Sequence, residues 1–312
     1  MDYLDAPGQT AASSVAAGII NPITGRRFVR SWRIEELLPE ARALYGELEQ
    51  ELGVQLWYEL PLIRTLFNRG EQNDWLARGG DAGYAIYLDD RPELDNLPAL
   101  THPAFGYAGV RQAARVDVGL LVRSYRERLE REGRFRSELV DYTALPPGYD
   151  RYVFCEGWRA RFNPYFDYLP HGGAKGEILL VRTTGPLLAS MFKHRVFVVP
   201  IRTDTYWVGA TNENTFPDDL PSPAAGDYLR QRLDEVLRDP YEVLAQRAAV
   251  RPTVRDRRML IGQHPQHLPY YIFNGLGTKG ASLAPLGSRW LLDLLDRGRA
   301  VPAEVDIRRF SY

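Results

Sequence analysis

The spacing of apolar positions predicts four helices. Apolar residues recur at every third or fourth position, as one buried helix face requires, over residues 34–52, 118–129, 224–238 and 282–298. Gly53 and Gly298 provide stops for the first and last helices, and Asp117 is a suitable N-cap for the second, which Gly133 ends. Pro285 falls in the first turn of the last helix, where a missing N–H does least harm.

Shorter runs predict strands at Tyr84–Leu88, Phe135–Val140, Tyr152–Cys155, Glu177–Arg182, Val196–Ile201, Tyr206–Ala210 and Tyr270–Phe273. Several of these alternate apolar and polar residues, which is typical of an antiparallel sheet with one wet face. Others, such as residues 152–155, are continuously apolar and indicate buried parallel strands. We therefore expect an α/β (α+β) chain with a nucleotide-binding-like domain and an antiparallel-sheet domain. Residues 89–98 and 217–223 are expected to be surface loops.

Composition and charge narrow the class of protein. The chain has 312 residues, 45% of them hydrophobic and 25% charged, which is typical of a globular protein. With 39 basic and 40 acidic residues, there is no electrostatic basis for a nucleic-acid partner. No apolar run is long enough to span a membrane. The single cysteine, Cys155, excludes a disulfide framework and fits a reducing compartment, so we expect a cytoplasmic enzyme or binding protein.

A glycine-rich segment follows the last expected strand. Residues 274–280 contain a literal G-x-G-x-x-G between a strand and a helix, a context that brings backbone N–H groups up to an anion or a polarised ring oxygen. Its place near the C-terminus disfavours a first-strand dinucleotide site. A tight structural turn and a ligand-facing loop of another kind both remain open.

The opening residues carry a second candidate. Asp2–Asp5 is a short segment that ends in an acid, as does the ribose-binding strand of a dinucleotide fold. The small and hydroxyl residues at 11–18 would let the backbone lie close to phosphate or ribityl oxygens. The alternative is a disordered N-terminus followed by an ordinary helix start.

Arginines form two further candidates. Residues 26–33 hold four arginines, which is usually a solvated face, although one guanidinium aimed into a pocket would bind a carboxylate in bidentate fashion. Pro252 fixes the chain beside Arg251, which favours a positioned side chain. His264 and His267 lie among prolines with no nearby ligand cluster, so we expect no metal site.

Taken in order, these segments resemble the FAD-dependent oxidoreductases of the D-amino-acid oxidase, glycine oxidase and sarcosine oxidase superfamily. The similar stretches are Ala-Ser-Ser-Val-Ala-Ala-Gly at 12–18, the strand at 135–140, Tyr-Val-Phe-Cys-Glu-Gly-Trp at 152–158, Val-Arg-Pro-Thr at 250–253 through Leu-Ile-Gly at 260–262, and Asn-Gly-Leu-Gly-Thr-Lys-Gly at 274–280. The resemblance covers nearly the whole chain.

The resemblance implies a discontinuous FAD-binding Rossmann-like domain at residues 1–34, 111–175 and 251–312, and a substrate domain at 35–110 and 176–250. It implies that the cofactor contacts Asp5, Ser13, Ser14, Ala17, Gly18, Val140, Gly157, Gly275, Leu276, Gly277, Thr278 and Gly280. It also implies three cations at the substrate: Arg251, Arg30 and Lys279, with Arg30 the second arginine of an R-x-x-R stretch. The two branches of the superfamily use different anchors, so not all three are expected to serve together.

Two departures from the family pattern carry expectations of their own. The family opens with a strand, a G-x-G-x-x-G turn and a helix before the acid-tipped strand, and here Met1 already lies in that second strand. We therefore expect weak FAD binding by a chain that lacks this unit. No cysteine lies near residues 250–251, where the sarcosine oxidase branch attaches its flavin, so the FAD is expected to be non-covalent.

The resemblance thus implies a flavoenzyme that oxidises a small amine or amino acid to an imine and passes electrons to O2. The alternatives are a flavin-dependent dehydrogenase with another acceptor and a non-catalytic remnant without FAD. We expect no nucleic-acid or membrane partner; the sequence does not indicate an oligomeric state.

Overall fold

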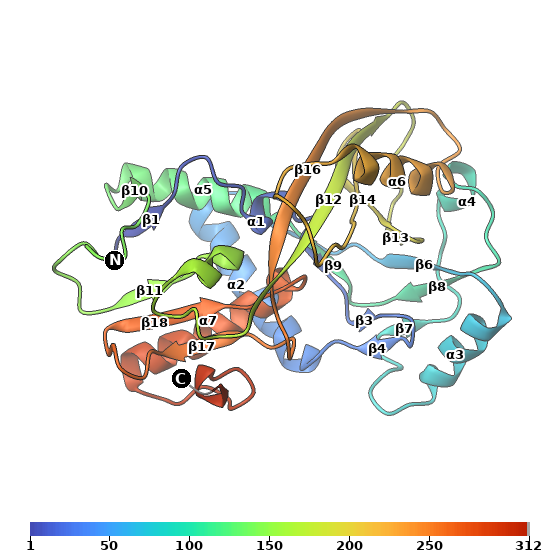
Figure 1. Ribbon diagram of the computed structural model, residues 1–312. Coiled ribbons are helices and arrows are strands. Elements are labelled where there is room, and N and C mark those ends of the chain that lie inside the picture. Colours follow the sequence, from blue (N-terminus) through green and yellow to red (C-terminus); the bar gives the residue numbers. More distant parts are fainter. Residues whose placement is uncertain (311–312) are drawn as a thin grey trace.

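The computed structural model describes residues 1–310, which form two lobes (Figure 1). One lobe holds the N-terminus, the short parallel strands and the helices α2, α5 and α7. The other is built on a large sheet with α6 on one face. The mixed α/β fold class expected from the sequence is confirmed.

The first lobe contains short strands in several small sheets. Parallel pairing joins β1 to β10 and β11 to β18, and β18 also pairs antiparallel with β17. The bounds are β1 Tyr3–Asp5, β10 Phe135–Ser137, β11 Tyr152–Phe154, β17 Leu260–Gln263 and β18 Tyr270–Asn274. Two further small sheets are β2-β9-β5 (Ile19–Ile20, Ala114–Val116, Trp57–Tyr58) and the hairpin β3-β4 (Ile23–Thr24, Val29–Arg30).

The second lobe is an eight-stranded sheet in the order β16-β12-β15-β14-β13-β6-β8-β7. Its strands are β6 Leu62–Leu66, β7 Leu88–Asp89, β8 Gly106–Val110, β12 His171–Thr183, β13 Met191–Lys193, β14 Phe197–Arg202, β15 Thr205–Gly209 and β16 Tyr241–Val254. All neighbouring pairs are antiparallel except β13 with β6. The two longest strands, β12 and β16, form a ribbon that runs from this sheet into the first lobe (Figure 1).

The helices begin and end where local chemistry favours it. The Asp117 and Ser222 side chains accept the backbone N–H groups of Leu120 and Ala225, which caps α5 and α6. Gly53 and Gly298 end α2 and α7 in the left-handed conformation. The helices are α1 Ala12–Val15, α2 Ile34–Leu52, α3 Arg69–Gly79, α4 Leu97–Leu100, α5 Val118–Arg131, α6 Pro223–Asp234 and α7 Gly280–Arg297, with 3-10 turns η1 Gly157–Phe162 and η2 Ile307–Arg309.

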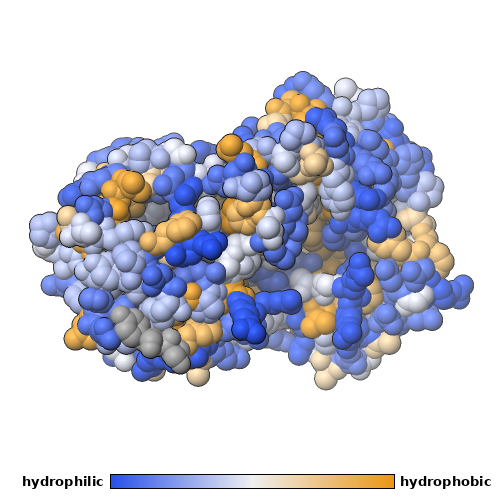
Figure 2. All heavy atoms as spheres, in the orientation of Figure 1, coloured by the Kyte–Doolittle hydropathy of each residue, from blue (hydrophilic) through white to orange (hydrophobic). Residues whose placement is uncertain are grey.

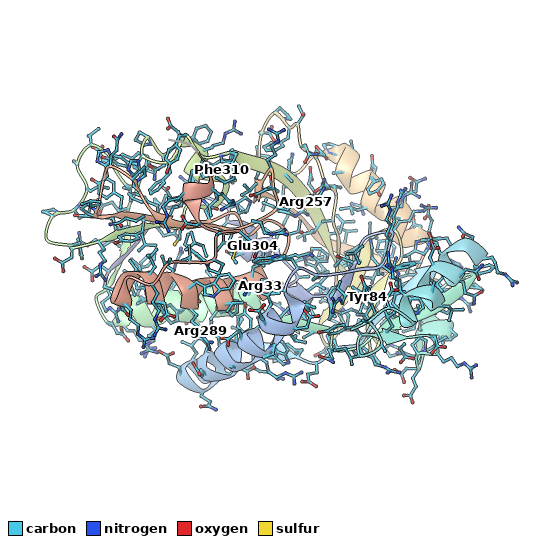
Figure 3. All side chains as sticks on the ribbon, turned by 90° about the horizontal axis from the view of Figure 1, so that it is seen from below. Arg33, Tyr84, Arg257, Arg289, Glu304 and Phe310 are labelled. Atoms are coloured by element: carbon cyan, nitrogen blue, oxygen red, sulfur yellow. The ribbon has the colours of Figure 1, made fainter. Side chains whose placement is uncertain are left out.

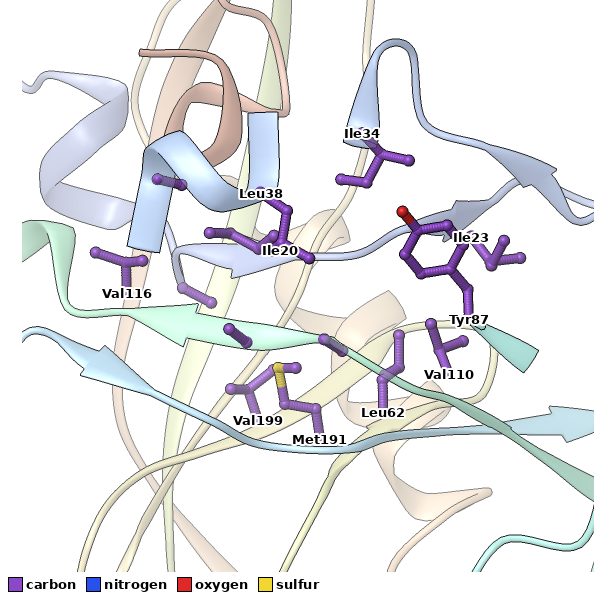
Figure 4. Close-up of a cluster of buried hydrophobic side chains, with 14 of the residues drawn as sticks. Ile20, Ile23, Ile34, Leu38, Leu62, Tyr87, Val110, Val116, Met191 and Val199 are labelled. Carbon is purple, nitrogen blue, oxygen red and sulfur yellow. The ribbon is translucent and has the colours of Figure 1, made fainter. Parts of the chain in front are cut away.

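The large sheet buries both of its faces. The inner face, toward α2 and the β2-β9-β5 sheet, packs Leu62, Met191 and Val199 against Ile20 and Leu38 (Figure 4). The outer face packs Val181, Tyr206 and Val208 against Leu229 and Leu233 of α6. The surface is hollowed where the two lobes meet (Figure 2).

The strand predictions need several corrections. Residues 84–87 form a turn and only Leu88–Asp89 is a strand. The strand expected at 135–140 ends at Ser137, and β12 begins six residues before the expected Glu177. Strand β16 was not predicted, because its polar residues obscure the alternation. Helix α6 ends at Asp234, four residues short of the expected end. No helix in residues 1–310 is long and apolar enough to cross a membrane.

Candidate functional site

The glycine-rich segment is a tight loop between β18 and α7. Gly275 has φ +76°, and a Cβ there would lie 2.6 Å from Val254 Cγ2, so this position requires glycine. Gly277 has φ +54° and donates its N–H to the carbonyl of Pro252 at 2.9 Å. Leu276 is half-buried and Thr278 is exposed. The loop therefore presents the positive end of α7, which begins at Gly280, beside the end of β16.

Lys279 turns from this loop toward the β3-β4 hairpin. Its Nζ donates to Ser31 Oγ at 3.1 Å, and that hydroxyl donates to the carbonyl of Asn21. Burial lowers the pKa of Lys279, and the nearby charges of Arg258 and Arg257 lower it further. No carboxylate in residues 1–310 forms an ion pair with Lys279. Its ammonium group is therefore a desolvated cation without a charge partner.

Arg251 lies on the inner face of the ribbon. Both of its terminal nitrogens donate to the carbonyl of Thr211 at 3.2 Å, and Nη1 also donates to Asn212 Oδ1 at 3.3 Å. Burial lowers the pKa of the guanidinium. Throughout the described part of the chain no carboxylate pairs with Arg251, so its charge is left for another anion.

Arg30 is placed differently from the other two cations. It ends the β3-β4 hairpin, and its guanidinium pairs with Glu35 and lies 5.2 Å from the ring centre of Tyr84, which is labelled in Figure 3. Its side chain is 35% exposed. The structure therefore brings Arg251 and Lys279 to the glycine loop as unpaired cations and gives Arg30 an internal partner. Its role at the substrate stays a prediction.

Two of the predicted cofactor-binding segments contact other parts of the fold: one contacts the glycine loop, and the other contacts strand β9. The carbonyl of Gly157 accepts Asn274 Nδ2 at 2.7 Å, which joins the end of β11 to the glycine loop. Gly18 has φ +72°, and a Cβ there would lie 1.8 Å from the carbonyl oxygen of Val116. The neighbouring Ala17 is buried. Glycine at position 18 is thus required by the close approach of the Val116 backbone.

The remaining predicted contacts lie farther along the first lobe. Asp5 is exposed and pairs with Arg126. Ser14 is exposed and its hydroxyl donates to the carbonyl of Ala11 at 2.7 Å, while Ser13 is half-buried in α1. Val140 is half-buried and follows β10 in a loop. Contact of these residues with a cofactor stays a prediction.

The apolar run Tyr152–Cys155 predicts a buried, inert thiol at its end, and the structure corrects this prediction for Cys155. Its side chain is reached by solvent at the end of β11. Neighbouring protein atoms nevertheless desolvate the thiol and, with the charge of Glu156, raise its pKa to about 12. The thiol is therefore protonated at neutral pH and a poor nucleophile.

The sequence did not point to Gly176, Thr211 or Asn212, which surround Arg251. The available signal was the spacing of glycines at 172, 173 and 176 inside one strand, since glycine in a strand marks a close approach of another group. A Cβ at Gly176 would lie 1.9 Å from Arg251 Nη2.

The discontinuous parallel strands, the glycine loop at a helix N-terminus and the sheet that carries an unpaired arginine define an oxidoreductase of the flavin-binding type. Residues 4–294 match the family model described as FAD dependent oxidoreductase, the D-amino-acid oxidase (DAO) family. The chain belongs to this family, as the sequence resemblance indicated.

Individual relatives agree with this assignment. The chain is 24% identical to the glycine oxidase of Geobacillus kaustophilus (strain HTA426) over 92% of its length and 84% of the relative. The crystal structure of glycine oxidase from Geobacillus kaustophilus superposes with a TM-score of 0.79 at 21% identity, covering 97% of this chain and 90% of that one. An iminodiacetate oxidase from Chelativorans sp. BNC1 gives a TM-score of 0.76 at 20% identity, with 99% and 91% covered.

As a member of this family the protein is a FAD-dependent enzyme. The residues present fit the flavin end of that cofactor. The loop at 274–280 offers backbone N–H groups at a helix start, and Gly277 leaves its surroundings open, with one atom (the Pro252 carbonyl oxygen) as near as 4.0 Å to an added Cβ. Gly157 is also open, with no atom within 4 Å of an added Cβ.

Proposed function

We propose that this enzyme oxidises a small amine or amino acid to the corresponding imine, holds its FAD non-covalently and passes the electrons to O2. The observation that carries the proposal is Arg251, a half-buried guanidinium without a carboxylate partner in residues 1–310, on the sheet face beside the flavin loop. Such a charge is suited to an anionic substrate group in a medium of low dielectric. The lone cysteine fits a cytoplasmic location.

The bound FAD would supply the hydride acceptor for the carbon that bears the amine. Arg251 would bind the substrate carboxylate and fix its orientation. Lys279, which belongs to the glycine loop, would add positive potential there. With the hydride acceptor supplied in this way, the chain would need only to orient the substrate and keep its amine neutral, and no carboxylate base would be required.

The names of the relatives support the substrate class, but they do not agree on the electron acceptor. Glycine oxidase and iminodiacetate oxidase carry small amino acids in their names. A structure of L-proline dehydrogenase from P.horikoshii shares the fold with a TM-score of 0.70 at 13% identity, covering 92% of this chain and 86% of that one. A dehydrogenase with another electron acceptor is therefore the second candidate.

Arg251→Ala tests the proposal directly. It should raise KM for the best small amino acid by a factor that corresponds to a loss of roughly 2–5 kcal/mol in binding free energy. This is the cost of breaking a buried charge pair. Arg251→Lys should recover part of this loss. If both variants keep the wild-type KM for every amine and amino acid tried, the anchor is wrong.

The acceptor is settled by a separate measurement. The flavin is first reduced by substrate without O2, and reoxidation by O2 or by an artificial acceptor is then followed. Stoichiometric peroxide supports the oxidase; reoxidation only by the artificial acceptor supports the dehydrogenase.

A further inference from the structure

Arg251 is held in a way that leaves one particular edge of its guanidinium free. Nη1 directs its two N–H groups to the Thr211 carbonyl and to Asn212 Oδ1, and Nη2 directs one to the Thr211 carbonyl. Two donors remain, the Nε–H and the second N–H of Nη2. Within residues 1–310 neither has a hydrogen-bond acceptor, and the two lie on the same edge of the planar group.

Gly176 makes this placement possible. Ala174 is opposite Arg251 in the β12-β16 register, so Gly176 is the diagonal neighbour on the same face. A Cβ at Gly176 would lie 1.9 Å from Nη2 and 2.3 Å from Cζ of Arg251. The guanidinium therefore crosses β12 directly above a position without a side chain, and any larger residue would displace it.

The carbonyl that receives the guanidinium is itself fixed. The Thr211 N–H donates to the Glu177 carbonyl at 3.1 Å, and the Glu177 N–H donates to Thr211 Oγ1 at 2.9 Å. The fully buried Glu177 carboxylate accepts hydrogen bonds from Ser222 and Gln246. This network gives the Thr211 carbonyl little freedom to follow a displaced arginine.

We propose that Gly176 and Asn212 are positioning residues that present the Nε–Nη2 edge of Arg251, so that the substrate carboxylate binds side-on through two parallel hydrogen bonds. The proposal rests on the proposed function, since it assumes that Arg251 is the carboxylate anchor. It adds that the orientation of the anchor is set by residues that do not touch the substrate. Two parallel N–H···O bonds fix the plane of the carboxylate as well as its position.

The test uses acetate as the probe, with acetamide as the neutral match, and measures binding to the FAD-saturated full chain by calorimetry. Gly176→Ala should weaken acetate binding by roughly tenfold or more, about the loss of one charge-assisted hydrogen bond. Asn212→Ala should weaken it by roughly threefold. Acetamide binding should change little in either variant. Both variants should fold, because the Gly176 clash is with the flexible end of a side chain and Asn212 is exposed.

The decisive control repeats both substitutions in an Arg251→Ala background. There, neither should change acetate binding, because the group that they position is absent. The positioning proposal is overturned if the two substitutions weaken acetate binding equally in both backgrounds, or if they leave acetate binding unchanged when Arg251 is present. Either result leaves the role of Arg251 as carboxylate anchor intact. If Arg251→Ala itself binds acetate as tightly as the wild type, the anchor and the proposed function fail together.

Discussion

Two neighbouring cations on the inner face of the large sheet show how residues of like charge are kept in place. Lys193 of β13 is opposite Arg64 of β6 in the parallel register. The Arg64 guanidinium lies 4.3 Å from the ring centre of Phe28, and its buried Nε has no hydrogen-bond partner in residues 1–310. Lys193 Nζ donates to the Arg195 carbonyl at 2.7 Å. The sequence shows both charges but not that sheet pairing brings them together.

This pair predicts a specific pH dependence of stability. Burial, and then the charge of Arg64, lowers the pKa of Lys193 from 10.5 to about 8. Between these two values the unfolded chain binds more protons, so the contribution of Lys193 to the unfolding free energy rises with pH. Below about pH 8 the cost of the charged lysine is fully present. Lys193→Met should therefore be more stable than the wild type at pH 7, by up to about 3 kcal/mol, with the difference shrinking toward pH 10.

Urea unfolding of both forms at several pH values measures that difference. A gap between the two proteins that stays constant from pH 7 to 10 would show that Lys193 titrates normally. The comparison is restricted to the difference between the two forms, because other groups titrate in the same range.

A second prediction at this scale concerns Lys279. Lys279→Met removes a desolvated cation from the flavin loop, so the protein should fold at least as stably while flavin reduction or reoxidation slows by about tenfold, or 1.4 kcal/mol of barrier. Anaerobic and aerobic stopped-flow traces at the flavin absorbance separate the two steps. Arg289→Ala on the exposed side of α7 is the matched control, and its label in Figure 3 shows it at the surface. Equal rates of flavin reduction and reoxidation in the wild type and both variants would show that Lys279 has no role in these steps.

At the scale of elements, the sequence predicted helices better than strands. The ends of α2, α5 and α7 follow from caps and glycines that act within a few residues. The β12-β16 ribbon depends instead on pairing between segments about 70 residues apart. The same difference holds at the site: the glycine loop was recognisable from local sequence, whereas Gly176 and Asn212 acquire a role only when that ribbon forms.

Asp117 predicts how much one cap stabilises the fold. It caps α5 through Leu120 and also pairs at 2.9 Å with Arg115, whose side chain is 6% exposed. Asp117→Ala removes the cap and leaves a buried charge unpaired, so the unfolding free energy should fall by about 2–4 kcal/mol. Asp117→Asn keeps the cap and should cost less. If urea unfolding finds the two variants equally destabilised, the cap contributes nothing beyond the ion pair.

For the whole molecule, the predicted cofactor contacts join segments far apart in sequence, so bound FAD should act as a global stabiliser. At a free FAD concentration of 100 Kd, the expected gain is about 2.7 kcal/mol. Thermal unfolding should therefore shift upward with added FAD. Acid precipitation should release all flavin into the supernatant, because no cysteine lies near Arg251. Flavin that stays with the precipitate would contradict non-covalent binding, and an unchanged Tm would contradict binding to the native state.

Catalytic activity should also depend on the register in which β12 and β16 pair. Neighbouring residues on a strand face opposite sides, so a slip of one residue would exchange Arg251 for Val250 on the inner face. It would also withdraw the Pro252 carbonyl from Gly277. A slipped molecule would keep most of its backbone pairing, yet present an aliphatic side chain where the anion should bind. Specific activity per folded chain would then report the fidelity of strand pairing, a property that a melting curve does not resolve.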